Sequence, residues 1–412
     1  PVVGFKSFLG HTLGGAGAVE LVMSSMALRD QKVPACPNVR PEDVEYPGLT
    51  VASGTATARG IDATLNTSLG FGGANTCVVL VKEQARTTCT AQRGEYTPVI
   101  TGIGVVLPGA IGHHAFKARL SGAAPVPATI DDASLAEHMN IRRARRLSQY
   151  VKYTIAAASM AVRDAGLADR PELVASSAAL LGSMHGSACF CYDYYAQIVN
   201  EGVLAANPVL FAEGVPNAAA AHLSTTLGVK GACQTIIGTR TAGLDALALA
   251  ALRIGSGAVD RVIVVAAEEP CHVVDKAYRA FGLMAPEGGG AGFTASPGGV
   301  AFMLESAEAA RGRSVIPYAQ VIGSAWSSAD AADGGVSVAA RAGPGVRVID
   351  ALDGLLGEAF SVTPLAAIAA ELTGNAAPPD FTAACGDWAG GASAVSLRRL
   401  ERRLGGPSEE RP

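Results

Sequence analysis

Residues 236–255, which read IIGTRTAGLDALALAALRIG, predict a turn followed by a helix built from small side chains. The turn contains Gly238 and Thr239, and Arg240 stands where the helix begins. A helix N-terminus carries partial positive charge and free N–H donors, so it favours anions and disfavours cations. A guanidinium keeps its proton at working pH and cannot act as a nucleophile. Because an unpaired buried guanidinium would be costly, we expect Arg240 to pair with a buried carboxylate.

A second group of residues suited to chemistry lies near the start of the chain. Lys6 and His11 precede a helix rich in small side chains, and Gly10 stands directly before His11. Histidine is the side chain best suited to exchange protons near neutral pH. A histidine at the start of a glycine-rich helix is also commonly a capping or packing residue. Residue type and spacing alone therefore leave both interpretations open.

Helices and short apolar strands alternate along the chain and would position these residues. Strands are predicted at 75–83, 97–109, 178–183 and 261–267, and helices at 148–167 and 242–254. Short strands that are continuously apolar favour a mostly parallel sheet, covered by helices on both faces. Residues 84–96 are polar and aperiodic, which predicts a linker between two units.

The chain also contains an internal repeat. The first pair of similar segments is residues 5–28 and 352–372. Both begin with an apolar-Leu-Gly step before a small-residue helix. Compared position for position, Lys6 falls on Asp353 and His11 falls on Glu358.

A second pair of segments supports this repeat. Residues 68–83 resemble residues 384–401, with Phe71 near Trp388 and a register that the sequence leaves open by one residue. Each copy therefore ends with a helix, a glycine-rich turn and a strand. The order suggests the tail of one domain followed by a shortened copy of the same domain.

The composition excludes several classes of function. The chain has 412 residues, 49 of them glycine, and 49% are hydrophobic, which suits close packing in an α/β protein. A net charge of −4 gives no electrostatic reason to bind nucleic acid or an anionic membrane. No apolar run reaches the roughly 18 residues of a membrane span. We expect a cytoplasmic protein with reduced thiols.

The cysteines and histidines predict no metal site. Cys189 and Cys191 are close, but one intervening residue is a poor spacing for zinc. Six histidines have spacings typical of surface or core positions: His113, His114, His138, His185, His222 and His272. The chain begins at Pro1 within a predicted strand and without methionine, so we expect a fragment of a longer protein.

Two motifs carry a family resemblance. Residues 6–17 read KSFLGHTLGGAG, and residues 69–75 read LGFGGAN. Together they resemble the C-terminal half of the β-ketoacyl-acyl carrier protein synthases, the condensing enzymes of fatty-acid and polyketide assembly. Residues 97–109, 207–269 and 296–306 resemble the same family from its beginning. The resemblance covers almost the whole chain.

This resemblance implies a thiolase-like α/β fold, a layered αβαβα arrangement of two related halves. It also implies a mechanism. A cysteine at the mouth of a buried helix accepts an acyl group from acyl carrier protein as a thioester, which the helix dipole stabilises. Two histidines then assist decarboxylation of malonyl-acyl carrier protein. No cofactor or metal is implied, because the substrates are carried on the phosphopantetheine of acyl carrier protein.

The first copy would supply His11 as a catalytic histidine and Lys6 as the lysine that holds its region electrostatically. A turn would gate the pocket and contains Phe71, Gly72, Gly73 and Asn75. These assignments follow from the resemblance and not from the spacing.

The second copy departs from the family pattern. The family's nucleophile falls on Arg240, its lysine on Asp353 and its histidine on Glu358. Its middle histidine has no counterpart in residues 300–350. We therefore expect that this copy does not condense, and that Arg240 pairs with Glu358 or Asp353. Such a copy resembles the chain-length factors of type II polyketide and aryl-polyene systems, which often have Gln where this chain has Arg240.

The resemblance predicts three regions: residues 1–83 as the C-terminal part of a ketosynthase, 84–96 as a linker and 97–405 as a shortened, chain-length-factor-like domain. We expect condensation to be carried by the ketosynthase part, with this chain alone inactive and residues 1–83 unstable alone. The partners would be acyl carrier protein and a ketosynthase subunit, or a second copy. The alternatives are a non-catalytic, chain-length-determining partner and a thiolase-fold enzyme acting on CoA substrates.

Overall fold

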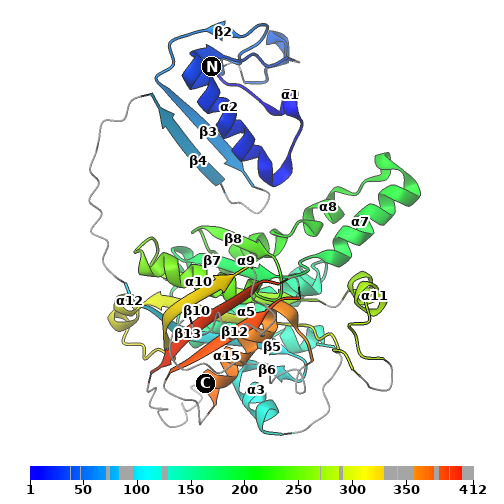
Figure 1. Ribbon diagram of the computed structural model, residues 1–412, viewed down its shortest axis with the longest axis vertical. Coiled ribbons are helices and arrows are strands. Elements are labelled where there is room, and N and C mark those ends of the chain that lie inside the picture. Colours follow the sequence, from blue (N-terminus) through cyan, green and yellow to red (C-terminus); the bar gives the residue numbers. More distant parts are fainter. Residues whose placement is uncertain are drawn as a thin grey trace. The chain divides into compact units, whose positions relative to one another are not determined.

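The structure, a computed structural model, describes most of the chain. The described residues are 1–37, 39–46, 48–70, 75–82, 96–122, 129–269, 271–286, 291–328, 341, 357–374, 380–388 and 390–400. The chain divides into two compact units, Pro1–Gln92 and Arg93–Pro412 (Figure 1). This division falls within the stretch predicted as a linker. Among the described residues, no helix is long and apolar enough to cross a membrane.

The Pro1–Gln92 unit is one helix packed on an antiparallel hairpin. Helix α2 (Ala16–Asp30) lies against β3 (Ala63–Leu69), which pairs with β4 (Asn75–Val81). The smaller elements are α1 (Lys6–Leu9), η1 (Leu13–Gly15), β1 (Lys32–Val33), η2 (Pro41–Asp43) and β2 (Thr57–Ala58).

The Arg93–Pro412 unit is built on a nine-stranded sheet with the order β12-β13-β11-β5-β10-β9-β7-β8, and β6 beside β5. The strands are β5 (Pro98–Leu107), β6 (Ala110–Ile111), β7 (Ala178–Ser183), β8 (Cys233–Ile237), β9 (Arg261–Glu268), β10 (Gly298–Ser306), β11 (Ala319–Ser327), β12 (Asp380–Gly386) and β13 (Ala392–Arg399). Apolar runs predicted three of these nine strands, β5, β7 and β9, and the β7 prediction matches residue for residue.

The prediction of a mostly parallel sheet is wrong. Of the strand pairs in the described residues, β7 is parallel to β8 and β9, whereas the other pairs of this sheet are antiparallel. Strand β10 is buried along its whole length, yet it runs antiparallel to both β5 and β9. A continuous apolar run reports burial on both faces and does not report strand direction.

Helices cover both faces of the sheet, as predicted. The main helices are α3 (Gly112–Ser121), α5 (Gln149–Asp164), α7 (Ala188–Glu201), α8 (Pro208–Gly214), α9 (Ala218–Leu227), α10 (Ala242–Gly255), α11 (His272–Ala280) and α15 (Thr363–Thr373). Shorter elements are η3 (Asp132–Leu135), α4 (Ile141–Ala144), α6 (Pro171–Ala175), η4 (Val203–Ala205), α12 (Ala307–Gly312) and η6 (Phe360–Val362).

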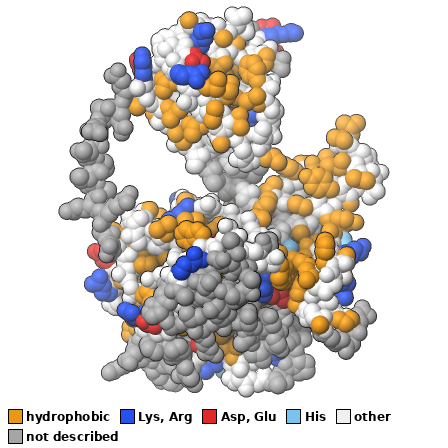
Figure 2. Space-filling view, viewed as in Figure 1, with side chains coloured by type: hydrophobic (Ala, Val, Ile, Leu, Met, Phe, Trp, Pro, Cys, Tyr) orange, Lys and Arg blue, Asp and Glu red, His pale blue; other side chains and the backbone are white. Residues whose placement is uncertain are grey.

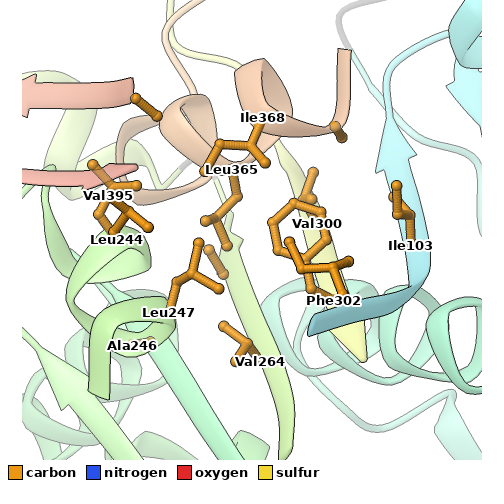
Figure 3. Close-up of a cluster of buried hydrophobic side chains, with 14 of the residues drawn as sticks. Ile103, Leu244, Ala246, Leu247, Val264, Val300, Phe302, Leu365, Ile368 and Val395 are labelled. Carbon is orange, nitrogen blue, oxygen red and sulfur yellow. The ribbon is translucent and has the colours of Figure 1, made fainter. Parts of the chain in front are cut away.

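Two buried clusters define the layers. One cluster lies between α5, α9 and one face of the β7–β9–β10 region. The other joins α10 and α15 to strands β5, β9, β10, β12 and β13. Figure 3 shows side chains from several of these elements meeting in this second cluster, among them Leu247, Leu365 and Phe302. The α/β, thiolase-like class predicted from the sequence is confirmed.

Close backbone contacts fix where α10 begins. A Cβ atom on Gly243 would stand 2.2 Å from the carbonyl oxygen of Ser361, and one on Gly182 would stand 2.2 Å from that of Ala242. Contacts this short forbid any side chain at either glycine. The start of α10 is therefore held between β7 and η6. This contact also fixes the position of the turn that precedes the helix.

The internal repeat is present in three dimensions. Gly10 and Gly357 both have φ of 73°, and three residues later Leu13 and Phe360 have φ of 49° and 53°. Each of these last two residues begins a one-turn helix, η1 or η6, that leads into α2 or α15. A non-glycine residue at positive φ is uncommon, so this shared pattern confirms the predicted alignment of the two copies.

The hairpins that end the two copies also match. Leu69 pairs with Asn75, and Gly386 pairs with Ala392. The connecting segments therefore have equal length, which aligns Phe71 with Trp388 and fixes the register that the sequence left open.

Candidate functional site

Arg240 stands two residues before α10, and its side chain is 15% exposed. Its Nη2 atom forms an ion pair with Oε2 of Glu358, whose side chain is 2% exposed. Its Nη1 atom donates to the carbonyl oxygen of Gly386 at 3.4 Å. The predicted pairing of Arg240 with a buried acid is confirmed for Glu358. The other predicted candidate, Asp353, lies outside the described residues.

The carboxylate of Glu358 is fixed by its own chain. Its Oε1 atom accepts from the backbone N–H of Phe360 at 2.5 Å and from the hydroxyl of Thr363 at 3.2 Å. Glu358 therefore meets Arg240 with both oxygens hydrogen-bonded, which compensates for burying two charges.

A group of aromatic rings begins at the guanidinium. Arg240 lies over the Trp388 ring, 5.1 Å from its centroid, a distance typical of a cation–π contact. Phe293 stacks on Trp388 at 5.4 Å, and Phe360 meets Phe293 edge-on at 5.6 Å. Tyr278 stacks on Phe360 at 5.5 Å. Trp388 therefore joins Arg240 to a connected aromatic group.

A partly buried hydrogen-bond chain reaches the Tyr278 ring. Nδ1 of His185 lies 3.0 Å from Oε2 of Glu268, and Nε2 lies 2.8 Å from the hydroxyl of Tyr278. Glu268 also accepts from the Ser361 hydroxyl at 2.5 Å. Burial first, and then the charges of Glu268 and Glu358, raise the pKa of Tyr278 to about 12. The Tyr278 hydroxyl therefore keeps its proton, and this chain of hydrogen bonds holds the Tyr278 ring in place.

Sequence reasoning missed most of this aromatic group. Trp388 was found through the repeat, but Tyr278 and Phe293 come from α11 and the loop after it. No spacing pattern links these positions to Arg240. Phe360 carried a signal that could have been used, because it aligns with Leu13 in the repeat.

Among the described residues that form the start of α10, none is a cysteine. Cys233 is the first residue of β8, and Ile237 is its last, so the strand separates this sulfur from Arg240. The prediction that Cys233 comes too early to occupy the helix mouth is confirmed. The position holds a permanent cation neutralised by Glu358 and cannot form a thioester.

In the Pro1–Gln92 unit, Lys6 and His11 have different partners. Nζ of Lys6 forms an ion pair with Oε1 of Glu20 at 2.5 Å. Nδ1 of His11 accepts from the backbone N–H of Leu13 at 3.1 Å, so in the neutral ring the proton lies on Nε2. The backbone N–H of Leu13 thus holds the His11 side chain in the same way that the backbone N–H of Phe360 holds the Glu358 side chain. Glu20 was missed, although a buried acid within an apolar helix is a recognisable signal.

Most of the predicted gating turn lies outside the residues that the structure describes. Phe71, Gly72 and Gly73 lie outside the described residues, and Asn75 is described by its backbone alone, as the first residue of β4. Their role in gating stays a prediction.

Two family models match the chain. The beta-ketoacyl synthase N-terminal domain matches residues 132–310, and the beta-ketoacyl synthase C-terminal domain matches residues 1–40. The chain belongs to the β-ketoacyl synthase family. The C-terminal domain of this family precedes the N-terminal domain here, which is the order expected for the end of one β-ketoacyl synthase followed by the beginning of another.

Curated relatives in the same family match parts of the chain. "Putative polyketide beta-ketoacyl synthase 1" of Streptomyces halstedii is 29% identical over 262 residues, which is 55% of this chain and 62% of that protein. The 3-oxoacyl-[acyl-carrier-protein] synthase 2 of Synechocystis is 39% identical over 79 residues, 19% of each protein. The chain thus spans about three-fifths of the length of the first relative.

Solved structures share the fold. The structure titled "The ishigamide ketosynthase/chain length factor" has a TM-score of 0.63 at 17% identity and covers 75% of this chain and 100% of that one. The structure titled "PfaC Keto synthase-Chain length factor" has a TM-score of 0.72 at 14% identity and covers 97% of this chain and 54% of that one. At these identities the likeness supports the β-ketoacyl synthase fold alone.

Proposed function

We propose that the Arg93–Pro412 unit is a non-catalytic, chain-length-factor-like partner in a β-ketoacyl synthase system of polyketide or fatty-acid assembly. The observation that carries this proposal is the Arg240–Glu358 ion pair at the start of α10. A condensing enzyme needs a thiolate there, because a thioester must form and its oxyanion must be stabilised. Arginine supplies no nucleophile, and its positive charge is already neutralised by Glu358.

The Pro1–Gln92 unit has the opposite character. His11 carries a protonated Nε2 when neutral, and this atom can donate to an oxygen of a reacting thioester or malonyl group. The nearby Lys6 is held by Glu20, which fixes its charge beside His11 in the chain. We assign this unit to the end of an active ketosynthase, which would carry out the decarboxylative condensation with malonyl-acyl carrier protein.

Acyl carrier protein and a ketosynthase subunit are the partners this function requires. The Arg93–Pro412 unit offers a surface for the latter on the arm formed by α7, η4 and α8. Its exposed apolar side chains are Tyr192, Tyr195, Val199, Val203, Leu204 and Val209, and Figure 2 shows hydrophobic side chains gathered on this arm. Strand β8 ends the sheet, so one of its edges is unpaired within the described residues. An exposed apolar arm and an open strand edge are each features that suit a protein partner. We place this assembly in the cytoplasm.

Acylation experiments test the catalytic assignment. The chain is incubated with radiolabelled acyl-acyl carrier protein and then with malonyl-acyl carrier protein, and peptides are mapped by mass. We expect no acyl thioester on any cysteine of Arg93–Pro412 and no release of CO2 by this chain alone. An acyl adduct on Cys233, or CO2 release without an added ketosynthase, would overturn the proposal.

A second experiment tests the partner role in the complete system. With the full ketosynthase present, Trp388→Ala should change the length of the product and leave the rate of malonyl decarboxylation within about twofold, because the substitution removes a large ring from the aromatic group at Arg240 and alters no reacting group. Leu204→Asp on the arm should abolish co-purification with the ketosynthase. Phe281→Asp is the matched control, since Phe281 is 80% exposed at the end of α11 and outside the arm. Equal loss of co-purification in both variants would contradict the assigned surface.

A further inference from the structure

Two cysteines and a histidine that are distant in sequence meet where α7 and α11 begin. The ligand atoms of Cys189, Cys271 and His272 all lie within 4.8 Å of one another. Cys189 is the second residue of α7, Cys271 is the N-cap of α11, and His272 is the first residue of that helix. The sequence predicted no metal site because Cys189 and Cys191 are poorly spaced for zinc. In the folded chain, Cys189 instead lies near Cys271, which is 82 residues further along the sequence.

We infer that Cys189, Cys271 and His272 form a binding site for a single zinc-type divalent cation. Two sulfurs and one imidazole nitrogen are the ligand set that Zn²⁺ prefers. Bond lengths of about 2.3 Å to sulfur and about 2.0 Å to nitrogen place tetrahedral ligand atoms roughly 3.5–3.8 Å apart. The cluster, with its ligand atoms within 4.8 Å, would have to contract by about 1 Å to reach that size. The fourth position is left for a water molecule or a neighbouring carboxylate.

A buried carboxylate beside the cluster points to the same conclusion. Glu269 is 7% exposed, and its Oε2 atom accepts from the backbone N–H of Tyr150 at 2.8 Å. Within the described residues, its Oε1 atom has no hydrogen-bond partner. A buried carboxylate oxygen without a donor is costly. A cation held by the residues two and three positions further along the chain would compensate for it.

The charges near the cluster favour a bound cation. The carboxylates of Glu269 and Asp193 lie close enough to Cys189 to interact with it electrostatically. On binding, each thiol releases one proton to solvent and donates a sulfur lone pair to the metal, while His272 binds through a neutral ring nitrogen. Both sulfurs sit at helix N-termini, which favour thiolates.

The cation would have a structural purpose. Helix α11 has no buried residue, so apolar packing does little to hold it. Its Tyr278 nevertheless stacks on Phe360 and hydrogen-bonds to His185. A metal joining α7 to the first residues of α11 would anchor this helix and position Tyr278 in the aromatic group around Arg240. The edge-on contact of the Tyr192 ring with the His272 ring, at 4.8 Å, already orients the imidazole.

Metal titration of the full chain tests the inference. The metal-free chain is titrated with Zn²⁺ against a chromophoric chelator, and with Co²⁺ to detect sulfur-to-cobalt charge transfer. We expect one ion per chain and thiolate charge transfer. Cys271→Ser and His272→Ala should each weaken binding at least about tenfold. Cys191→Ser is the matched control, because Cys191 lies two residues from Cys189 and donates to the carbonyl of Gly214. Binding that is weakened as much by Cys191→Ser overturns the site.

A measurement on the unsubstituted chain guards against variants that fail to fold. Zn²⁺ should slow alkylation of Cys189 and Cys271 by iodoacetamide at least about tenfold relative to Cys191, as mapped on peptides, because thiolates bound to metal react slowly. It should also slow hydrogen exchange in the α11 peptide. Equal alkylation with and without Zn²⁺, or a disulfide between Cys189 and Cys271 in the purified chain, would overturn the inference.

Discussion

The two copies of the helix–hairpin segment, α2–β3–β4 and α15–β12–β13, share a backbone design but differ in burial. Helix α15 buries eight of its residues, whereas α2 buries three, two of which are Glu20 and Ser24. Strand β13 buries six consecutive residues, but β3 has none that is buried. In β3, Leu65 and Leu69 are 64% and 80% exposed. The same segment is thus a core element in one unit and a surface element in the other.

The difference shows what a helix–hairpin segment needs from its surroundings. In the Arg93–Pro412 unit, β11 extends the hairpin and α10 packs against β13. The Pro1–Gln92 unit is described without equivalent elements. Backbone features that the local sequence determines, such as the positive φ of Leu13, are present without these neighbouring elements. The burial of side chains is not, because it depends on elements that are distant in the sequence.

The largest expected effect is on local stability within one chain. In hydrogen exchange of the full chain, amides of β12 and β13 should be protected by orders of magnitude more than those of β3 and β4, because opening an exposed hairpin costs little. Peptide-resolved mass spectrometry measures both segments in a single sample. Comparable protection would show that Pro1–Gln92 is covered by another surface, such as a partner, and would remove the contrast.

The second prediction compares the ion pairs of the two copies. Arg240→Met leaves Glu358 buried without its partner and should destabilise the Arg93–Pro412 unit by about 3–5 kcal/mol. Lys6→Met should cost about 0–1 kcal/mol, because the Lys6 side chain is 47% exposed. Denaturant unfolding followed by tryptophan fluorescence reports the first loss, since Trp326 and Trp388 both lie in that unit. Hydrogen exchange of α2 reports the second.

A double variant completes this test. Arg240→Met with Glu358→Leu should recover much of the lost stability, because no charge is left buried alone. If the double variant is as unstable as Arg240→Met, the loss comes from disturbed packing around Trp388 rather than from the unpaired carboxylate.

The third prediction uses two glycines with the same φ. A Cβ atom at Gly357 would stand 2.7 Å from the carbonyl oxygen of Thr294, whereas at Gly10 it would meet nothing within 4 Å. Gly10 combines φ of 73° with ψ of 176°, a conformation nearly limited to glycine, so Gly10→Ala should cost about 1–3 kcal/mol. Gly357→Ala should cost at least about 1 kcal/mol more, because the contact with Thr294 is added to the backbone strain. Fluorescence-detected unfolding measures Gly357→Ala, and hydrogen exchange of α2 measures Gly10→Ala. Equal costs would mean that the loop around Thr294 moves freely.

The smallest effect concerns Asp245 in the first turn of α10. Burial raises its pKa above the ordinary value of 3.8, although hydrogen bonds from Ser393 and Thr241 oppose this. A carboxyl group whose pKa is higher in the folded state stabilises the fold below pH 3.8, and this contribution is lost as pH rises through the raised pKa. Asp245→Asn should flatten this part of the profile of unfolding free energy against pH. An unchanged slope in the variant would assign it to other groups.

Local pattern predicted more of the fold than of the site. The β7 strand, the extent of α10 and the alignment of His11 with Glu358 follow from apolar runs and small-residue spacing, which act over a few residues. Strand direction was predicted wrongly, because β10 is equally apolar whichever way its neighbours run. Tyr278 and Phe293 could not be found, since long-range packing alone brings them to Arg240.

The alignment of the repeat also explains why Glu358 was found as the partner of Arg240. The small-residue helix and the glycine before it fix the alignment of the two copies, so the difference between His11 and Glu358 can be seen in the sequence. Cys271 and His272 have no aligned counterpart in the other copy. Their approach to Cys189 depends on the path of the chain after β9.

The backbone N–H that Leu13 aims at His11, and that Phe360 aims at Glu358, makes no distinction between an imidazole nitrogen and a carboxylate oxygen. The main chain at this position therefore accepts either side chain and orients it through the same kind of hydrogen bond. An exchange of histidine for glutamate at this position therefore requires no change in the main chain. For the same reason, the double variant Arg240→Cys, Glu358→His would place an imidazole within reach of the backbone N–H of Phe360 without any redesign of the backbone.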